Sequence, residues 1–194
     1  MTRILLLLAL LAGAVHAEQQ TLSDGQIIRG KFTQERHLQG FANPVKSEGH
    51  FVLVAGRGLI WTTDRPFPLT TVITGDGLAQ SIGGKQATRL DARSMPFLTK
   101  LSAMMGSALA GDWAALDSDF SLRRDGGRIV LQPKQADGAG VAVKSIALTV
   151  SRFVDQADIE KPGGDFDRLA FSDQILSSGP PTAQESAAFD QLRP

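Results

Sequence analysis

The sequence has no cysteine and no tyrosine among its 194 residues. Without cysteine, the chain cannot use thiol catalysis, thiolate metal ligands or disulfide bonds. It also lacks an excess of charge of either sign, because 20 Lys and Arg residues balance 20 Asp and Glu residues. This balance argues against a strongly basic surface, and the 6% aromatic content argues against a platform for stacking bases. We therefore expect no nucleic-acid partner.

Motifs for catalysis or for binding a metal or cofactor are also missing. The histidines His16, His37 and His50 show neither HxH nor HExxH spacing, and no serine lies in a GxSxG or SxxK motif. The glycine-rich segments 75–77 and 81–85 lack Walker or Rossmann spacing and are typical of hairpin turns. We therefore expect no enzyme activity, no cofactor and no metal ion.

The first seventeen residues have the organisation of a cleavable signal peptide. Arg3 gives a positive start, the run Ile4–Val15 is apolar but too short to span a bilayer, and Ala17 supplies the small residue before cleavage. No later apolar run reaches membrane-spanning length. We expect residues 1–17 to be removed and residues 18–194 to form one soluble exported domain.

Turn signals containing glycine recur along the chain, which predicts a series of antiparallel hairpins. The predicted strands cover about 30–37, 48–55, 58–64, 69–74, 77–82, 86–90, 119–124, 128–133, 141–151, 153–160 and 166–172. Apolar residues alternate over 141–150 except for one slip at Lys144-Ser145, so one face is covered and the other is wet. The runs Phe51–Ala55 and Leu59–Trp61 are apolar on both faces and need cover on both sides.

Helical periodicity is clear in one interior segment, between Pro96 and Gly111. Its apolar stripe comprises Phe97, Leu98, Leu101, Met104, Met105, Ala108 and Leu109. A second short helical piece is expected at Asp112–Leu116, and a third near the C-terminus, where Thr182 and Glu185 have capping-box spacing. The sequence therefore predicts a mainly β fold (α+β), a curved antiparallel sheet of about ten or eleven strands with a small helical cover on one side.

The order of several short motifs resembles a known family. These motifs are Phe32-Thr33-Gln34, Leu59-Ile60-Trp61 followed by Pro66, Gly75-Asp76-Gly77, Pro96-Phe97-Leu98, Asp112-Trp113 and Leu131-Gln132-Pro133-Lys134. Together they resemble the periplasmic outer-membrane lipoprotein carrier (LolA-like) family over about residues 28–172. The resemblance implies an incomplete antiparallel β-barrel with a helical lid over an apolar cavity that shelters acyl chains. It further implies a periplasmic location, an acylated protein or lipid as cargo, an inner-membrane exporter and an outer-membrane receptor.

The chain departs from the family pattern at the residue expected to hold the lid shut. The family's Arg-Pro pair falls on Ala55 and Gly56, so this chain would be a divergent member and Arg57 is the candidate lid latch. The expected cargo-binding residues lie on the sheet and on the lid, and comprise Phe32, Phe51, Leu53, Leu59, Trp61, Phe97, Leu98, Leu101, Met104 and Met105. The adjacent methionines suit this role because unbranched thioethers repack around irregular ligands.

Several alternatives stay open at this point. The apolar stripe can equally be ordinary core. The same fold can serve a module that senses lipid or lipoprotein, or a carrier of another lipid-linked product. A hydrolase assembled from scattered Ser, His and Asp residues ranks last because no local motif supports it. A soluble shuttle is most simply a monomer.

Overall fold

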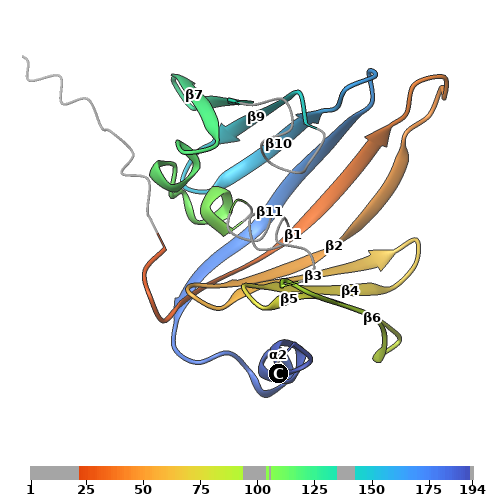
Figure 1. Ribbon diagram of the computed structural model, residues 1–194, viewed down its shortest axis with the longest axis vertical. Helices are drawn as coiled ribbons and strands as arrows, with labels where there is room; N and C mark the ends of the chain where they lie inside the picture. Colours follow the sequence, from red (N-terminus) through yellow and green to blue (C-terminus); the bar gives the residue numbers. More distant parts are fainter. Residues whose placement is uncertain (1–21, 94–103, 105, 135–142, 193–194) are drawn as a thin grey trace, which may run out of the picture.

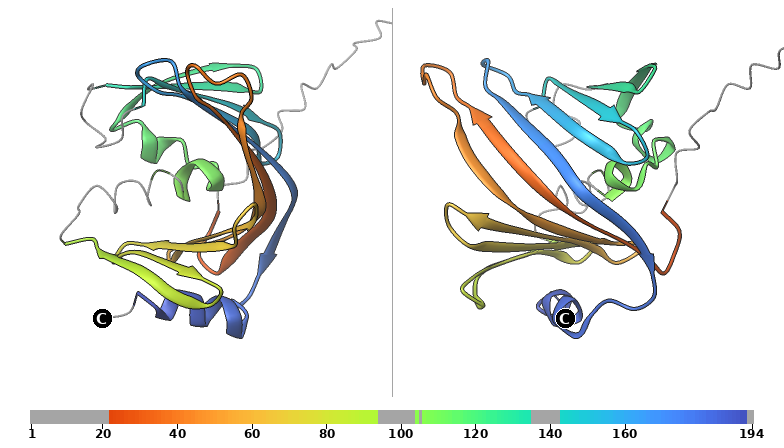
Figure 2. Two further views of the ribbon diagram at one scale, coloured as in Figure 1. Left: turned by 90° about the vertical axis from the view of Figure 1, so that its right-hand side faces the viewer. Right: turned by 180° about the vertical axis from the view of Figure 1, so that it is seen from behind.

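The computed structural model describes residues 22–93, 104, 106–134 and 143–192, and these form one antiparallel sheet with short helices (Figure 1). The strands are β1 (Gln26–His37), β2 (Val45–Val54), β3 (Gly58–Arg65), β4 (Leu69–Thr74), β5 (Gly77–Ile82), β6 (Lys85–Asp91), β7 (Phe120–Asp125), β8 (Arg128–Pro133), β9 (Ser145–Val150), β10 (Val154–Glu160) and β11 (Phe166–Ser178). Their order across the sheet is β6-β5-β4-β3-β2-β1-β11-β10-β9-β8-β7. The sheet bends into a deep C in profile (Figure 2), which confirms the predicted mainly β, incomplete barrel.

The pairing of β1 with β11 joins the two halves of the sheet. The register runs from Gln26 opposite Ser178 to His37 opposite Phe166. Both strands are longer than predicted, because residues 26–29 of β1 pair with residues 175–178 of β11. Strand β9 begins at Ser145, so the slip in alternation at Lys144-Ser145 marks the start of the strand.

Short helical segments lie inside the concavity of the sheet (Figure 2). Residues 104 and 106–110 are helical, and the backbone turns at Gly111, which has a positive φ of 73°. A 3₁₀ turn, η1 (Ala114–Leu116), follows and buries Leu116. The predicted helix end and the predicted short helical piece are both found here.

The central strands are covered on both faces, as their sequence predicted. Phe51, Leu53 and Leu59 pack with Leu109 on the concave side. The intervening residues of β2 and β3 pack on the convex side with the C-terminal segment, in a cluster formed by Ile27, Val52, Val54, Ile60, Val72, Ala79, Phe189 and Leu192. Helix α2 (Ala183–Asp190) supplies this outer cover and packs on β3 and β4 (Figure 1).

A capping box and an ion pair hold α2 in place. The Thr182 hydroxyl accepts a hydrogen bond from the Glu185 N–H at 3.2 Å, and the Thr182 N–H donates to the Glu185 carboxylate at 2.8 Å. The same carboxylate accepts two hydrogen bonds of 2.7 Å from the Arg29 guanidinium on β1. The hydrogen bonds from Arg29, and then from the backbone of Thr182, hold the pKa of Glu185 below its ordinary value against the opposing effect of burial.

Glu185→Gln should therefore destabilise the protein at neutral pH and have little effect in acid. A lowered pKa in the folded state stabilises above the ordinary value of 4.5, and the contribution is lost as the pH falls through the folded pKa. We expect a loss of about 1–2 kcal/mol at pH 7, measured by urea unfolding, and a difference from wild type that closes below pH 4.5. Glu48→Gln, which removes the exposed pair with Arg65, is the matched control and should cost less than about 0.5 kcal/mol. A difference that did not shrink as the pH fell below 4.5 would contradict this account.

Gly30 leaves the space into which the Phe51 ring fits. A Cβ atom at this position would lie 2.7 and 2.9 Å from two ring carbons of Phe51 and 3.0 Å from Cγ of Gln174. Because Phe51 is buried, its ring cannot move aside. Gly30→Val should cost about 1–3 kcal/mol in the free energy of unfolding. Gly75→Ala, where a Cβ meets nothing within 4 Å, should stay within about 0.5 kcal/mol of wild type. Equal stability of the two variants would refute the steric argument.

Candidate functional site

Four aromatic rings meet at the centre of the concave face. The rings of Phe32 and Trp61 stack with centroids 3.8 Å apart. Phe51 lies 6.1 Å from Trp61, and Phe171 meets both Phe51 and Trp61 edge-on at 5.7 and 6.2 Å. The sheet thus brings Phe32, Phe51 and Trp61, three of the predicted cargo-binding residues, together in one cluster with Phe171.

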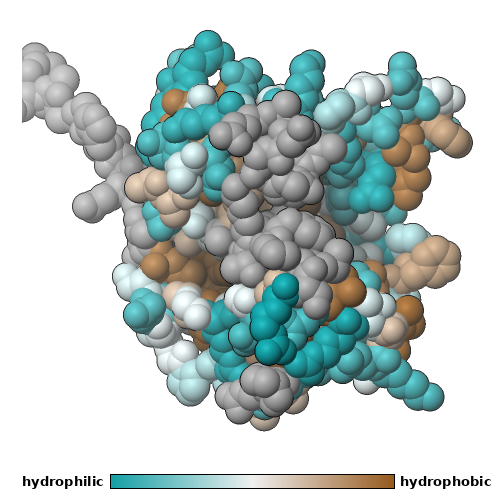
Figure 3. All heavy atoms as spheres, viewed as in Figure 1, coloured by the Kyte–Doolittle hydropathy of each residue, from teal (hydrophilic) through white to brown (hydrophobic). Residues whose placement is uncertain are grey.

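An apolar cavity of about 270 Å³ adjoins this cluster, between the helical residues and strands β7–β11. Its lining comprises Trp61, Met104, Ala108, Leu109, Leu116, Phe120, Leu131, Val143, Ile146, Leu148, Val154, Ala157, Ile159, Lys161, Asp167, Leu169 and Phe171. Lys161 and Asp167 are the charged members of this lining. Figure 3 shows hydrophobic residues recessed on the left of this face, with hydrophilic residues above and below them. This cavity can shelter an apolar chain from water, and Lys161 and Asp167 offer it polar contacts.

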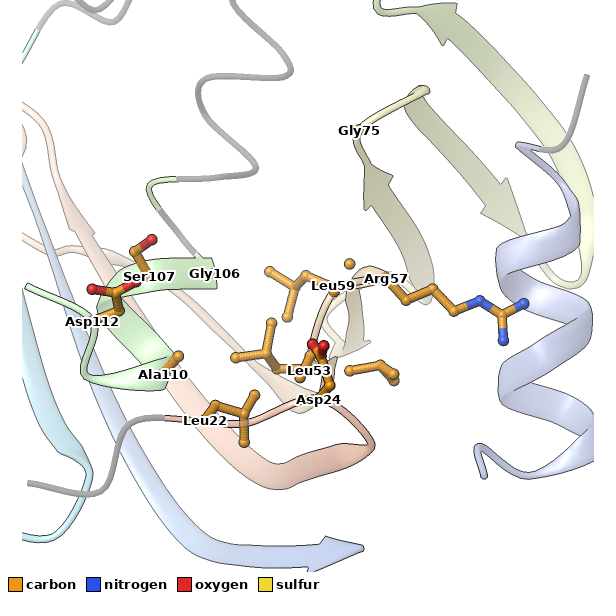
Figure 4. Close-up of a pocket in the computed structure, with 14 residues that line it drawn as sticks. Leu22, Asp24, Leu53, Arg57, Leu59, Gly75, Gly106, Ser107, Ala110 and Asp112 are labelled. Carbon is orange, nitrogen blue, oxygen red and sulfur yellow. The ribbon is translucent and has the colours of Figure 1, made fainter. Parts of the chain in front are cut away.

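A second hollow, of about 340 Å³, lies on the other side of the helical segment 106–110. Leu22, Leu53, Leu59 and Ala110 form its apolar part, and the carboxylates of Asp24 and Asp112 also line it (Figure 4). Leu109 lines the first cavity and Ala110 the second. A single turn of helix therefore separates the two hollows.

The predicted cargo-binding residues are divided between these features. Trp61 and Met104 line the apolar cavity, Phe32 and Phe51 pack behind Trp61, and Leu53 and Leu59 line the second hollow. The other four, Phe97, Leu98, Leu101 and Met105, lie outside the described residues.

Arg57, the candidate lid latch, is directed toward the C-terminal helix and not toward the helical segment in the concavity (Figure 4). Its Nη2 donates to Oδ1 of Asp190 at 3.3 Å, and its guanidinium carbon lies 4.6 Å from the centre of the Phe189 ring. Arg57 lies in the turn between β2 and β3, and its side chain extends from this turn to α2 (Figure 4). Within the described residues, these contacts of Arg57 therefore link the β2–β3 turn to α2.

Most of the cavity wall was not among the predicted site residues. It comes from β7–β11, whose apolar residues form one core cluster with Trp113 and Leu116. A signal was present in the sequence, since Asp167, Leu169 and Phe171 alternate along β11 and share the concave face. That pattern marks a covered face but does not distinguish a cavity wall from a filled core.

Within the parts of the chain that the structure describes, no group of three or more His, Asp or Glu side chains is placed to hold a metal ion. In the same residues, no helix is long and apolar enough to cross a membrane.

An open antiparallel sheet wrapped around an apolar interior, with helices in its concavity, defines a half-barrel with an internal cavity. The family model described as outer membrane lipoprotein carrier protein LolA-like matches residues 10–155, which is well over half of the chain. The chain therefore belongs to this LolA-like family, as the motif order predicted. Membership and fold together suggest a carrier role for lipoprotein or lipid.

Solved structures with a similar arrangement share little sequence with this chain. A LolA superfamily protein from Nitrosomonas europaea is 12% identical, with a TM-score of 0.43, over 87% of this chain and 92% of that one. A putative outer membrane lipoprotein-sorting protein domain from Vibrio parahaemolyticus is 11% identical, with a TM-score of 0.42, over the same shares. A chain of the Pseudomonas aeruginosa MucA/MucB complex is 14% identical, with a TM-score of 0.36, over 87% of this chain and 56% of that one. A search of curated proteins found no match.

Proposed function

We propose that residues 1–17 act as a signal peptide, which directs export of this protein to the periplasm and is then cleaved. There, residues 18–194 carry the acyl chains of lipoproteins or other lipids from an inner-membrane exporter to an outer-membrane receptor. The apolar cavity beside the aromatic cluster is the observation that supports this proposal, since its lining is apolar except at Lys161 and Asp167. Two of the predicted cargo-binding residues, Trp61 and Met104, form part of its wall, and two others, Leu53 and Leu59, line the second hollow.

The energetics define what such a carrier must do. Transfer of each methylene from water to an apolar environment is favourable by about 0.8 kcal/mol. Exposure of a sixteen-carbon chain to water therefore costs about 12 kcal/mol. The carrier must offset most of this and still release its cargo. The sequence contains no nucleotide-binding motif, so release follows a difference in affinity between the cavity and the next acceptor.

The described cavity is slightly smaller than the usual ligand pockets, which measure about 300–1,000 Å³. One helical turn, residues 106–110, separates it from the second hollow of about 340 Å³. Outward movement of this turn would join the two hollows into one groove along the concave face. A helical cover that shifts in this way makes room for a chain when loaded and closes over the sheet when empty.

The proposal is tested by native mass spectrometry of the protein purified gently from the periplasm of its own host, followed by transfer measurements to membrane vesicles. A co-purifying acylated protein or lipid that passes to acceptor vesicles is the expected result. Retention of lipid without transfer would favour a sensor on the same fold. A protein that stays empty and takes up no fluorescent fatty acid would refute the carrier function.

A further inference from the structure

The charged end of the apolar cavity carries more positive than negative charge. Asp167 on β11 is buried, and each of its carboxylate oxygens accepts a hydrogen bond from a different cation. Lys161 Nζ donates to Oδ2 at 2.7 Å, and Arg36 Nε donates to Oδ1 at 3.1 Å. Two cations therefore share one carboxylate, which leaves a net charge of +1 on the three groups.

Pairing of the strands does not require the second cation. Arg36 on β1 stands directly opposite Asp167 in the register, so this pair already joins the two strands and neutralises the carboxylate. Lys161 comes instead from the loop after β10 and lines the cavity beside Ile159 and Leu169. The Lys161 side chain is 31% exposed, so its ammonium group is only partly dehydrated beside the apolar walls, and an anionic partner would replace the lost water.

Neighbouring acidic groups are already engaged elsewhere. Glu160 pairs with Lys144 at 3.4 Å, Asp158 pairs with Arg168 at 2.7 Å, and Asp165 accepts the N–H of Gln39 at 2.8 Å. Of the three N–H donors of Lys161, the described contacts of its side chain use one, toward Asp167. Among the described residues, no side chain accepts from the other two donors, and Lys161 lines a cavity whose other residues, except Asp167, are apolar.

We infer that Lys161, held in position by Asp167, selects cargo in which an acyl chain ends in an anionic group, a carboxylate or a phosphate. This inference rests on the proposed carrier function and specifies the class of its cargo. The chain lies among Leu131, Leu148 and Leu169, and the anionic group meets the Lys161 ammonium at the charged end. A charge-assisted hydrogen bond in such partly desolvated surroundings is about twice as strong as a neutral one.

The test compares three ligands with the same sixteen-carbon chain, namely palmitate, hexadecyl phosphate and hexadecanol. Their affinities are measured by displacement of the neutral dye N-phenylnaphthylamine from delipidated protein purified after expression of the full sequence. We expect the wild-type protein to bind at least one anionic ligand about tenfold more tightly than hexadecanol. The relative affinities of palmitate and hexadecyl phosphate distinguish a carboxylate from a phosphate.

Lys161→Gln should bring the anionic ligands within about twofold of hexadecanol, whose own affinity should not change. Lys161→Arg keeps the charge and should keep the preference. Lys144→Gln is the matched control, because Lys144 does not line the cavity, and it should behave as wild type.

Equal binding of the three ligands by the wild-type protein would overturn the inference, and this comparison does not depend on whether any variant folds. A preference that survives in Lys161→Gln would also overturn it. Failure of the carrier function gives a different result, since neither the dye nor hexadecanol would then bind.

Discussion

Replacement of Ala157 by Phe is expected to abolish most uptake of acyl chains while leaving the sheet folded. Ala157 lies on β10 opposite Leu148 and Leu169, and its side chain lines the apolar cavity. A benzyl group here occupies space that cargo would otherwise fill. Displacing about two methylenes costs about 1.6 kcal/mol, or ~15-fold in affinity for a fluorescent fatty acid.

The matched control is Ala170→Phe on the adjacent strand. Ala170 is exposed and lies on the opposite face of β11, so the added ring points away from the cavity. This variant should bind fatty acid as the wild type does. If Ala157→Phe instead unfolds the protein, the space is too small to accept a ring and behaves as ordinary core. Normal uptake by a folded Ala157→Phe would place the cargo elsewhere.

Replacement of Phe189 by Ala is expected to produce the largest loss of stability, about 3–5 kcal/mol in the free energy of unfolding. Phe189 is only 3% exposed and anchors α2 in the convex cluster. Its ring also makes a cation–π contact with the Arg57 guanidinium. Truncation therefore leaves a void beneath the helix and removes one side of that contact. Urea unfolding followed by circular dichroism measures the change.

Phe67→Ala provides the control, since Phe67 is 79% exposed and its loss should change stability by less than about 0.5 kcal/mol. The folded fraction of Phe189→Ala should still take up fatty acid, because Phe189 belongs to the convex cluster and does not line the concave cavity. A loss below 1 kcal/mol would show that α2 contributes little to the fold.

The sequence predicted the strands well because their boundaries depend on local chemistry. Glycine-containing turns such as 75–77 and 125–127 end one strand and start the next whatever packs around them. The capping box at Thr182 and Glu185 is likewise local and is found as predicted. The extra length of β1 and β11 was not predictable in this way, because it arises from pairing between segments far apart in the chain.

The candidate site was only partly predictable for the same reason. Trp61 and Phe32 were identified from motif order, yet their stacking depends on the register that sets Phe32 opposite Gly49 and Phe171. The contact of Arg57 with α2 joins residues 133 positions apart, which no local pattern could indicate. Likewise, no local pattern indicates that Lys161 and Asp167 pair with each other and line an apolar cavity.

The strand order has a mechanical consequence. Within the described residues, β6 and β7 end the sheet and do not pair with each other. A closed barrel has a radius fixed by its strand number and stagger, whereas a sheet with two free margins can change its curvature by small adjustments of twist between neighbouring strands. Such flexing breaks no backbone hydrogen bond. The half-barrel can thus change its width without local unfolding. In the proposed carrier function, this would allow it to hold acyl chains of different bulk.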